Sequence, residues 1–208
     1  MNPILLVLFV FFPSARAEEP RLATERVILH TNYGDMTLGF YPDVAPRHVQ
    51  QILRLVELGF YEDSEIFRIE PGFVAQVENF NMRKIPLAIE KQQAVGKIPA
   101  EFSAVPHVRG TLSMARLEDI NSAESSFSLV LGDSPHLNGH YTVFGKILAG
   151  METLTAIEKV AVDEHAHPKT IVKINHAEVV RGEQAPTSKP YWLPIAGIVM
   201  LFLIVILR

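Results

Sequence analysis

The 208-residue chain contains no cysteine. This absence excludes disulfides, thiolate nucleophiles, iron–sulfur clusters and cysteine-based zinc sites. The chain also lacks an excess of positive charge, because 19 Lys and Arg residues stand against 23 Asp and Glu residues, a formal net charge of −4. Nucleic-acid-binding surfaces need clustered Lys and Arg, so we expect no nucleic-acid partner.

Long apolar runs are scarce and lie at the two ends of the chain. Residues 4–12 form the first, and Pro-Ser-Ala-Arg-Ala follows it at 13–17. A run of about ten residues is too short to cross roughly 30 Å of hydrocarbon as a helix. Its length and the small residues after it are typical of a secretory signal. We predict a signal peptide at 1–17, although no Lys or Arg precedes the run and a buried N-terminal helix is the alternative.

The second run, residues 193–207, is uncharged and apolar, with Tyr-Trp before it and Arg208 after it. With the aromatic pair included, it reaches about 25 Å as a helix. The sequence therefore predicts a transmembrane helix at 191–207, the alternative being a buried core helix. Residues 182–190 are rich in Pro, Gly and polar side chains and predict a linker. The terminal Arg favours the cytoplasm, which predicts a single-pass type I membrane protein.

Between these ends, the hydrophobic pattern alternates between two periods. Residues 26–31 have strand composition, 32–35 form a turn, and apolar residues then recur at every second position from Met36 to Phe40, which predicts a hairpin. Helical spacing follows Pro46 and recurs after Met151. The apolar helix positions are Val49, Ile52, Leu53 and Val56, then Met151, Leu154, Ile157 and Val160.

Further short runs predict strands at 66–69, 73–77, 110–115, 127–131, 141–144 and 170–180. The polar stretch 81–101 predicts a surface loop with a short helix near 89–95. Many short strands with two separated helices favour a closed antiparallel barrel over a doubly wound sheet.

Four motifs take this reading further: TNYGD at 31–35, FRIEPGFVAQ at 67–76, RGTLSMA at 109–115 and YTVFGK at 141–146. In this order they resemble the cyclophilins, a family of peptidyl-prolyl cis–trans isomerases. Residues 125–128 and 135–139 look most like a divergent secretory-pathway branch known from plants. The resemblance implies a mainly β domain at 26–181, a closed antiparallel eight-stranded barrel capped by two α-helices.

Isomerisation of an X-Pro bond requires breaking amide resonance, against a barrier of roughly 18–20 kcal/mol. It requires no cofactor and no metal, only a slot for the ring and a donor that favours the twisted amide. The resemblance implies that Arg68 is the catalytic donor. It also implies that Phe73 is the pocket floor, that Val74 and Leu137 are apolar walls, and that Gln76 positions the arginine or the substrate backbone.

The resemblance places other residues along the same groove. Ala115 and Arg116 would line it for the residues that precede proline, and Tyr141 takes a position that is often His. A Gln that the resemblance leads us to expect near Ser126 is absent. Ser128 stands where the resemblance implies an aromatic pocket wall, and this change removes apolar contact with the proline ring.

Two further positions bear on ligands. His136 stands where cyclosporin-sensitive members have Trp, so the sequence predicts poor cyclosporin binding. His165 and His167 could place two imidazoles together, but their polar loop context favours solvated side chains over a metal site.

The leading functional hypothesis is a peptidyl-prolyl isomerase whose partners are proline-containing polypeptides. The terminal runs add a membrane partner, bound through the C-terminal helix, and an extracytoplasmic domain in the endoplasmic reticulum or secretory pathway, or in a bacterial periplasm. The sequence thus predicts assistance to the folding of secretory or membrane proteins. Two alternatives remain open: a catalytically weak or inactive membrane-anchored module that binds proline peptides, and a subunit of a membrane complex.

Overall fold

The computed structural model describes residues 19–182. The predicted signal peptide, the predicted membrane helix at 191–207 and the linker beyond residue 182 lie outside these described residues. Within 19–182, no helix has both the length and the apolar character needed to cross a bilayer.

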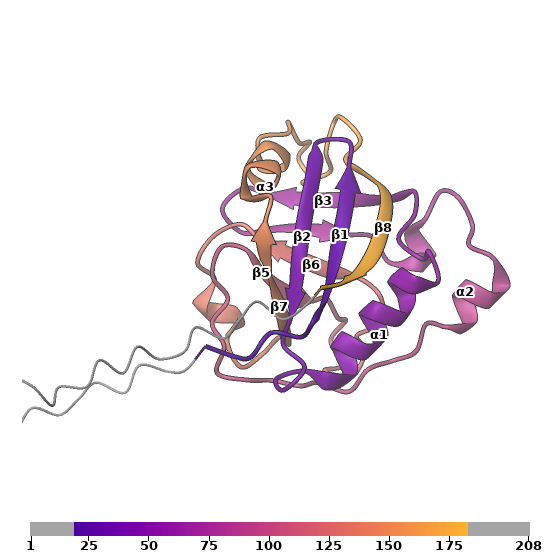
Figure 1. The fold of residues 1–208 in the computed structure, drawn as a ribbon. Helices are drawn as coiled ribbons and strands as arrows, with labels where there is room; N and C mark the ends of the chain where they lie inside the picture. Colours follow the sequence, from indigo (N-terminus) through magenta and orange to yellow (C-terminus); the bar gives the residue numbers. More distant parts are fainter. Residues whose placement is uncertain (1–18, 183–208) are drawn as a thin grey trace, which may run out of the picture.

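Eight antiparallel strands close into a barrel in the order β1-β2-β7-β5-β6-β4-β3-β8 (Figure 1). The barrel closes where Ser64 on β3 pairs with Ile174 on β8. The predicted closed, eight-stranded, mainly β architecture is therefore confirmed. The strands are β1 (Glu25–Thr31), β2 (Gly34–Phe40), β3 (Ser64–Glu70), β4 (Val74–Val77), β5 (Thr111–Met114), β6 (Phe127–Val130), β7 (Val143–Ala149) and β8 (Lys173–Arg181).

The first hairpin follows from the alternation in its sequence. Val27 pairs with Leu38 and Leu29 pairs with Met36, and all four side chains are buried. Alternate residues of a strand point to opposite faces of the sheet, so this register turns both apolar sets into the barrel. The predicted hairpin is confirmed.

Large aromatic side chains fill the barrel interior. Phe127 meets Phe144 and Tyr61 edge-on, with ring centroids 5.9 and 5.6 Å apart. The buried Tyr61 hydroxyl donates to the carbonyl of Ser125 at 2.8 Å. An eight-stranded barrel has room for little beyond its own side chains, so the predicted polypeptide substrate would have to bind on the outer surface.

Two helices lie at opposite ends of the barrel, α1 (Pro46–Glu57) and α3 (Met151–Glu158) (Figure 1). The Glu101 carboxylate accepts the backbone N–H groups of Arg47 and His48 at 3.2 and 3.1 Å. This contact satisfies donors at the positive end of the α1 dipole. The predicted loop helix is α2 (Ile89–Gln93), and two 3₁₀-helices are η1 (Phe80–Met82) and η2 (Pro135–Leu137).

The predicted strand at 141–144 was wrong in its bounds, because β7 begins at Val143 and continues to Ala149. Gly145, just beyond the predicted bounds, continues the strand and allows β7 and β2 to approach closely. A Cβ at this position would lie 2.2 Å from the carbonyl oxygen of Gly39 on β2. Similarly, α3 ends at Glu158 and Val160 follows it.

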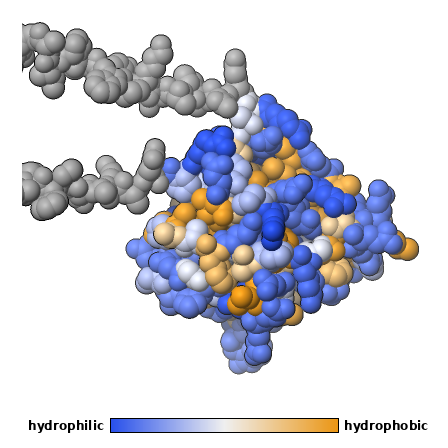
Figure 2. All heavy atoms as spheres, turned by 90° about the horizontal axis from the view of Figure 1, so that it is seen from below, coloured by the Kyte–Doolittle hydropathy of each residue, from blue (hydrophilic) through white to orange (hydrophobic). Residues whose placement is uncertain are grey.

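The surface seen from below in Figure 2 is mostly hydrophilic, with separate small hydrophobic areas. Some of the most exposed large apolar side chains are Leu117 and Met82, which are 77% and 50% exposed. Both line one cavity on the outside of the barrel, next to the predicted site.

Candidate active site

A cavity of about 200 Å³ lies on the outer face of the β3–β4–β6–β5 part of the barrel. The structure brings nine of the eleven predicted site residues to its walls, together with Ser113 and Met114. The predicted residues in contact with the cavity are Arg68, Phe73, Val74, Gln76, Ala115, Arg116, Ser128, Leu137 and Tyr141.

A register shift between Ile66 and Arg68 interrupts the alternation of β3, so that Ile66 and Ile69 are both buried while Arg68 lies at the cavity. Its guanidinium donates from Nη1 to Oε1 of Gln76 at 3.3 Å, and its Nη2 forms an ion pair with Glu70. The guanidinium carbon lies 5.9 Å from the ring centroid of Phe73. With its side chain 34% exposed, Arg68 is oriented by two partners while its charged end still reaches the cavity.

Phe73 lies in the turn between β3 and β4, one residue before the strand in which it was predicted. The imidazole of His136 stacks against it at a tilt, with ring centroids 5.3 Å apart. Leu137, which belongs to η2, is buried beside the same cavity. The 3₁₀-helix thus supplies an apolar wall from a segment far away in sequence.

Ser126 does not line this cavity but lies beside Gln76 on the wall of an adjoining one. Its hydroxyl accepts a hydrogen bond from Nε2 of Gln76 at 3.2 Å and donates to the Val77 carbonyl at 2.6 Å. This arrangement fixes the amide of Gln76 with its oxygen toward Arg68. Ser126 therefore holds Gln76 in place, near the position where the resemblance predicts a Gln.

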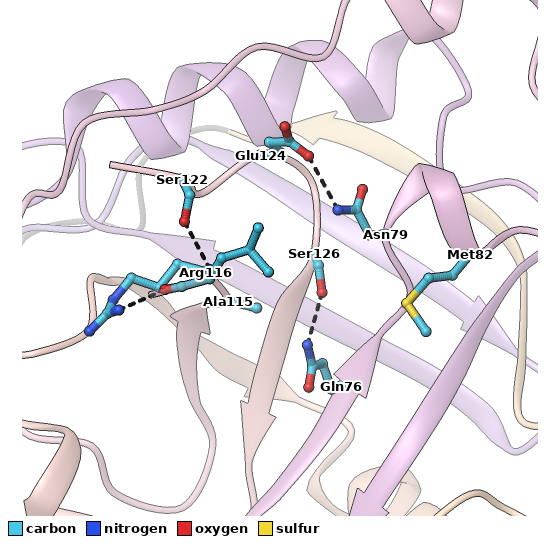
Figure 3. A pocket seen from close by; sticks show the side chains of 9 residues that line it. Gln76, Asn79, Met82, Ala115, Arg116, Ser122, Glu124 and Ser126 are labelled. Atoms are coloured by element: carbon cyan, nitrogen blue, oxygen red, sulfur yellow. Dashed lines mark hydrogen bonds between the residues drawn. The ribbon is translucent and has the colours of Figure 1, made fainter. Parts of the chain in front are cut away.

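A second cavity, of about 140 Å³, shares the wall formed by Gln76, Ala115 and Arg116 with the first. Figure 3 shows its far side, where the amide of Asn79 donates to Glu124 at 3.2 Å and the Met82 side chain lies at the edge. Because they share this wall, the two cavities together form one groove on the outer surface of the barrel.

Arg116 borders both cavities and lies over the ring of Tyr141, with its guanidinium carbon 4.4 Å from the ring centroid. Its Nε and Nη2 both donate to the carbonyl of His140, at 3.3 and 3.1 Å. Cation–π contact and these hydrogen bonds hold the side chain across the groove.

Two polar residues near the cavity, Glu70 and His107, were missed at the sequence level. Glu70 was detectable, because residues two apart on one strand share a face. His107 is buried, with its ring nitrogens 3.0 Å from Asn138 Oδ1 and 3.0 Å from the hydroxyl of Ser113. Burial lowers the pKa of His107, which favours the neutral ring. No sequence pattern links His107 to Ser113 and Asn138.

The His165–His167 segment lies in an exposed loop, as the sequence predicted. The backbone N–H groups of both residues donate to the carboxylate of Asp163 at 2.9 Å. Across residues 19–182, no group of three or more His, Asp or Glu side chains is arranged to hold a metal ion.

The described residues thus form a closed β-barrel that carries, on its outer wall, a cavity bordered by an oriented arginine and an aromatic ring. Comparison with known proteins identifies the family. Residues 26–179 match the family described as cyclophilin type peptidyl-prolyl cis-trans isomerase/CLD. The chain therefore belongs to the cyclophilin-type peptidyl-prolyl cis–trans isomerases.

Similar proteins come from several kingdoms. A peptidyl-prolyl cis-trans isomerase of Arabidopsis thaliana is 50% identical over 154 residues, which cover 73% of this chain and 68% of the plant protein. A probable peptidyl-prolyl cis-trans isomerase of Brucella abortus is 38% identical over 173 residues, covering 80% and 86% of the two chains.

The fold also matches solved structures. The crystal structure of a cyclophilin type isomerase from Cryptosporidium parvum superposes with a TM-score of 0.67 and 26% identity, covering 76% of this chain and 99% of that chain. A second structure of that protein, determined in the presence of the dipeptide Ala-Pro, has a TM-score of 0.65, with the same identity and coverage.

Proposed function

We propose that Arg68 is the residue through which this isomerase stabilises the twisted prolyl amide, in substrates that are proline-containing polypeptides. The observation that carries the proposal is the guanidinium itself, held by Gln76 and Glu70 at the edge of a cavity beside the Phe73 ring. The proline ring would lie on Phe73, between the apolar walls formed by Val74 and Leu137.

The chemistry follows from which amide geometry the donors favour. In a planar X-Pro amide, the nitrogen lone pair is delocalised and is a poor acceptor. Rotation by about 90° localises the lone pair, so an N–H donor beside the ring nitrogen binds the twisted amide better than the planar one. Because Arg68 is oriented before substrate arrives, little reorganisation accompanies the reaction.

The adjoining cavity supports a longer substrate. Arg116 and Ala115 border both cavities, so the residues before proline would cross this shared wall toward Asn79 and Glu124. The Ala-Pro dipeptide used with the Cryptosporidium parvum relative is a short peptide of the same kind. Extension of the peptide toward its N-terminus should therefore add affinity.

The test is isomerisation of a proline peptide by the full-length protein and its Arg68→Ala and Arg68→Lys variants. Loss of one such donor should lower kcat by about 100-fold or more. Arg68→Lys keeps the charge but loses the planar set of donors, so it should recover little. Arg54→Ala, at an exposed position on α1, is the control, and equal rates for Arg68→Ala and Arg54→Ala would refute the role.

A peptide-binding module without turnover is a second candidate, favoured by Ser128. This small side chain lies on the cavity wall and pairs across neighbouring strands with Gln76 and Ser113. An aromatic ring at this position would add apolar contact with proline. Peptide binding measured by calorimetry, with no acceleration of isomerisation by the unmodified protein, would establish this function instead. A subunit role in a membrane complex would be revealed by co-purification.

We also propose that clients are secretory or membrane proteins, and that the domain lies outside the cytoplasm on a C-terminal anchor. The support is the sequence of the two apolar ends, at 4–12 and 193–207, which lie outside the described residues.

For cyclosporin, His136 offers a smaller ring than Trp over Phe73. His136→Trp should therefore raise cyclosporin affinity in a direct binding assay, and equal affinities would contradict this.

A further inference from the structure

The turn between β3 and β4 presents one backbone donor outward. Phe73 N–H donates to the Glu70 carbonyl at 2.9 Å, Pro71 occupies the second position, and Gly72 has φ +75°, which together describe a type II turn. The N–H of Gly72 is not used within such a turn. It donates to Oε1 of Glu158 at 2.8 Å, at the end of α3, beside which β3 ends in Figure 1.

Arg109 orients this carboxylate. Its Nη1 lies 2.7 Å from Oε2 of Glu158, and its Nη2 donates to the hydroxyl of Thr155 at 3.0 Å. The same guanidinium donates to the carbonyl of Leu131, whose N–H donates to the carbonyl of Phe73 at 2.8 Å. The Arg109–Glu158 pair is therefore bonded directly to the backbone before Phe73, at Gly72, and through Leu131 to the carbonyl of Phe73 itself.

The Arg109–Glu158 pair and its bonds to this backbone, together called the clamp, leave the turn little freedom. A Cβ on Gly132 would lie 2.3 Å from the carbonyl oxygen of Gly72, so the loop after β6 already touches the turn. The Glu158 side chain is only 20% exposed. Burial raises the pKa of Glu158, but the Gly72 N–H and the Arg109 guanidinium outweigh it and lower the pKa below its ordinary value, so the carboxylate stays ionised at neutral pH.

We propose that Glu158, oriented by Arg109, is a positioning residue for proline binding, because it fixes the turn that presents Phe73. This inference rests on the proposed role of Phe73 as the pocket floor. Arg68 has its own partners in Gln76 and Glu70. Loss of the Glu158 carboxylate should therefore displace Phe73 more than Arg68. It should raise KM while leaving kcat largely unchanged.

The experiment compares full-length Glu158→Ala, Glu158→Gln and Glu152→Ala, the last removing an exposed carboxylate from the same helix. Loss of a charged hydrogen-bond acceptor should raise KM for a proline peptide by about tenfold. Glu158→Gln keeps an oxygen for the Gly72 N–H and should recover most of the affinity, while Glu152→Ala should match the unmodified protein. Hydrogen exchange of the Gly72 amide, followed by NMR, should accelerate in Glu158→Ala.

The outcomes separate this inference from the proposed function. An inactive Arg68→Ala combined with an unchanged KM in Glu158→Ala overturns the positioning role alone. An active Arg68→Ala overturns the catalytic proposal. In that case the amide exchange of Gly72 and the KM for the peptide, both measured in Glu158→Ala, still test the clamp. Should Glu158→Ala fail to fold, Thr155→Val removes one acceptor of Arg109 and should raise KM by about two- to threefold; an unchanged KM there overturns the inference.

Discussion

At the scale of single residues, the proposed binding of a proline ring in this cavity makes a prediction for Ser128, which lines the cavity wall. Ser128→Phe would place a ring against the cavity of about 200 Å³. A gain of about 1 kcal/mol from added apolar contact corresponds to a roughly fivefold lower KM. Steady-state isomerisation measures this change, and Ser128→Ala controls for loss of the hydroxyl. A KM that stays equal or rises in a fully folded Ser128→Phe protein would contradict the prediction.

His48 makes stability depend on pH. Its ring is buried, Nδ1 lies 2.6 Å from Glu101, and Nε2 has no hydrogen-bond partner among residues 19–182. Burial lowers the pKa of His48 below 6.5 despite the Glu101 carboxylate, which raises it. The unfolded chain therefore binds more protons just below that pH, and stability must fall as pH falls through this window.

The measurement is the urea midpoint of unfolding at about pH 7.5 and about pH 5.5. His48→Gln retains an amide donor for Glu101 but does not titrate, so its midpoint should fall less over this interval than that of the unmodified protein. His165→Gln, in the exposed loop, serves as the matched control and should behave like the unmodified protein. An identical pH dependence for His48→Gln would show that the buried ring does not resist protonation.

At the scale of elements, the closeness of β2 and β7 depends on Gly145. A Cβ there would meet the Gly39 carbonyl oxygen at 2.2 Å and a methyl group of Leu112 at 3.0 Å. Gly145→Ala should therefore lower the free energy of unfolding by about 1–3 kcal/mol, through overpacking. Gly96→Ala, where a Cβ meets nothing within 4 Å, is the control for denaturant unfolding. Equal midpoints for the two variants would disprove the steric argument.

The same element shows what sequence could and could not predict. The hairpin of β1 and β2 follows from residue alternation, and α1 follows from helical spacing. Alternation reports which face a residue occupies, not which strand lies beside it. The neighbours of β7, which are β2 and β5, are far away in sequence, and the close approach that Gly145 permits exists only once the barrel is closed.

The candidate site divides in the same way. Arg68, Phe73 and Gln76 lie in one contiguous motif, so resemblance could place them together. Glu158 joins Gly72 across 86 residues, and His107 joins Asn138 across 31 residues. Such contacts depend on tertiary packing and carry no local pattern, which is why the residues that support the site were not predicted.

At the scale of the whole molecule, the remaining prediction concerns attachment to a membrane. Each Arg at the centre of a spanning helix costs roughly 2.5–3.5 kcal/mol of insertion free energy, so a Val199→Arg, Leu203→Arg double variant should be released from microsomes by alkaline carbonate. The unmodified protein and a Val199→Leu, Leu203→Ile control should stay in the membrane pellet. In a separate protease-protection assay, the domain should resist added protease until detergent opens the vesicles. Release of the unmodified protein would contradict the anchor, and cleavage in intact vesicles would contradict the orientation, because a type I protein keeps this domain inside.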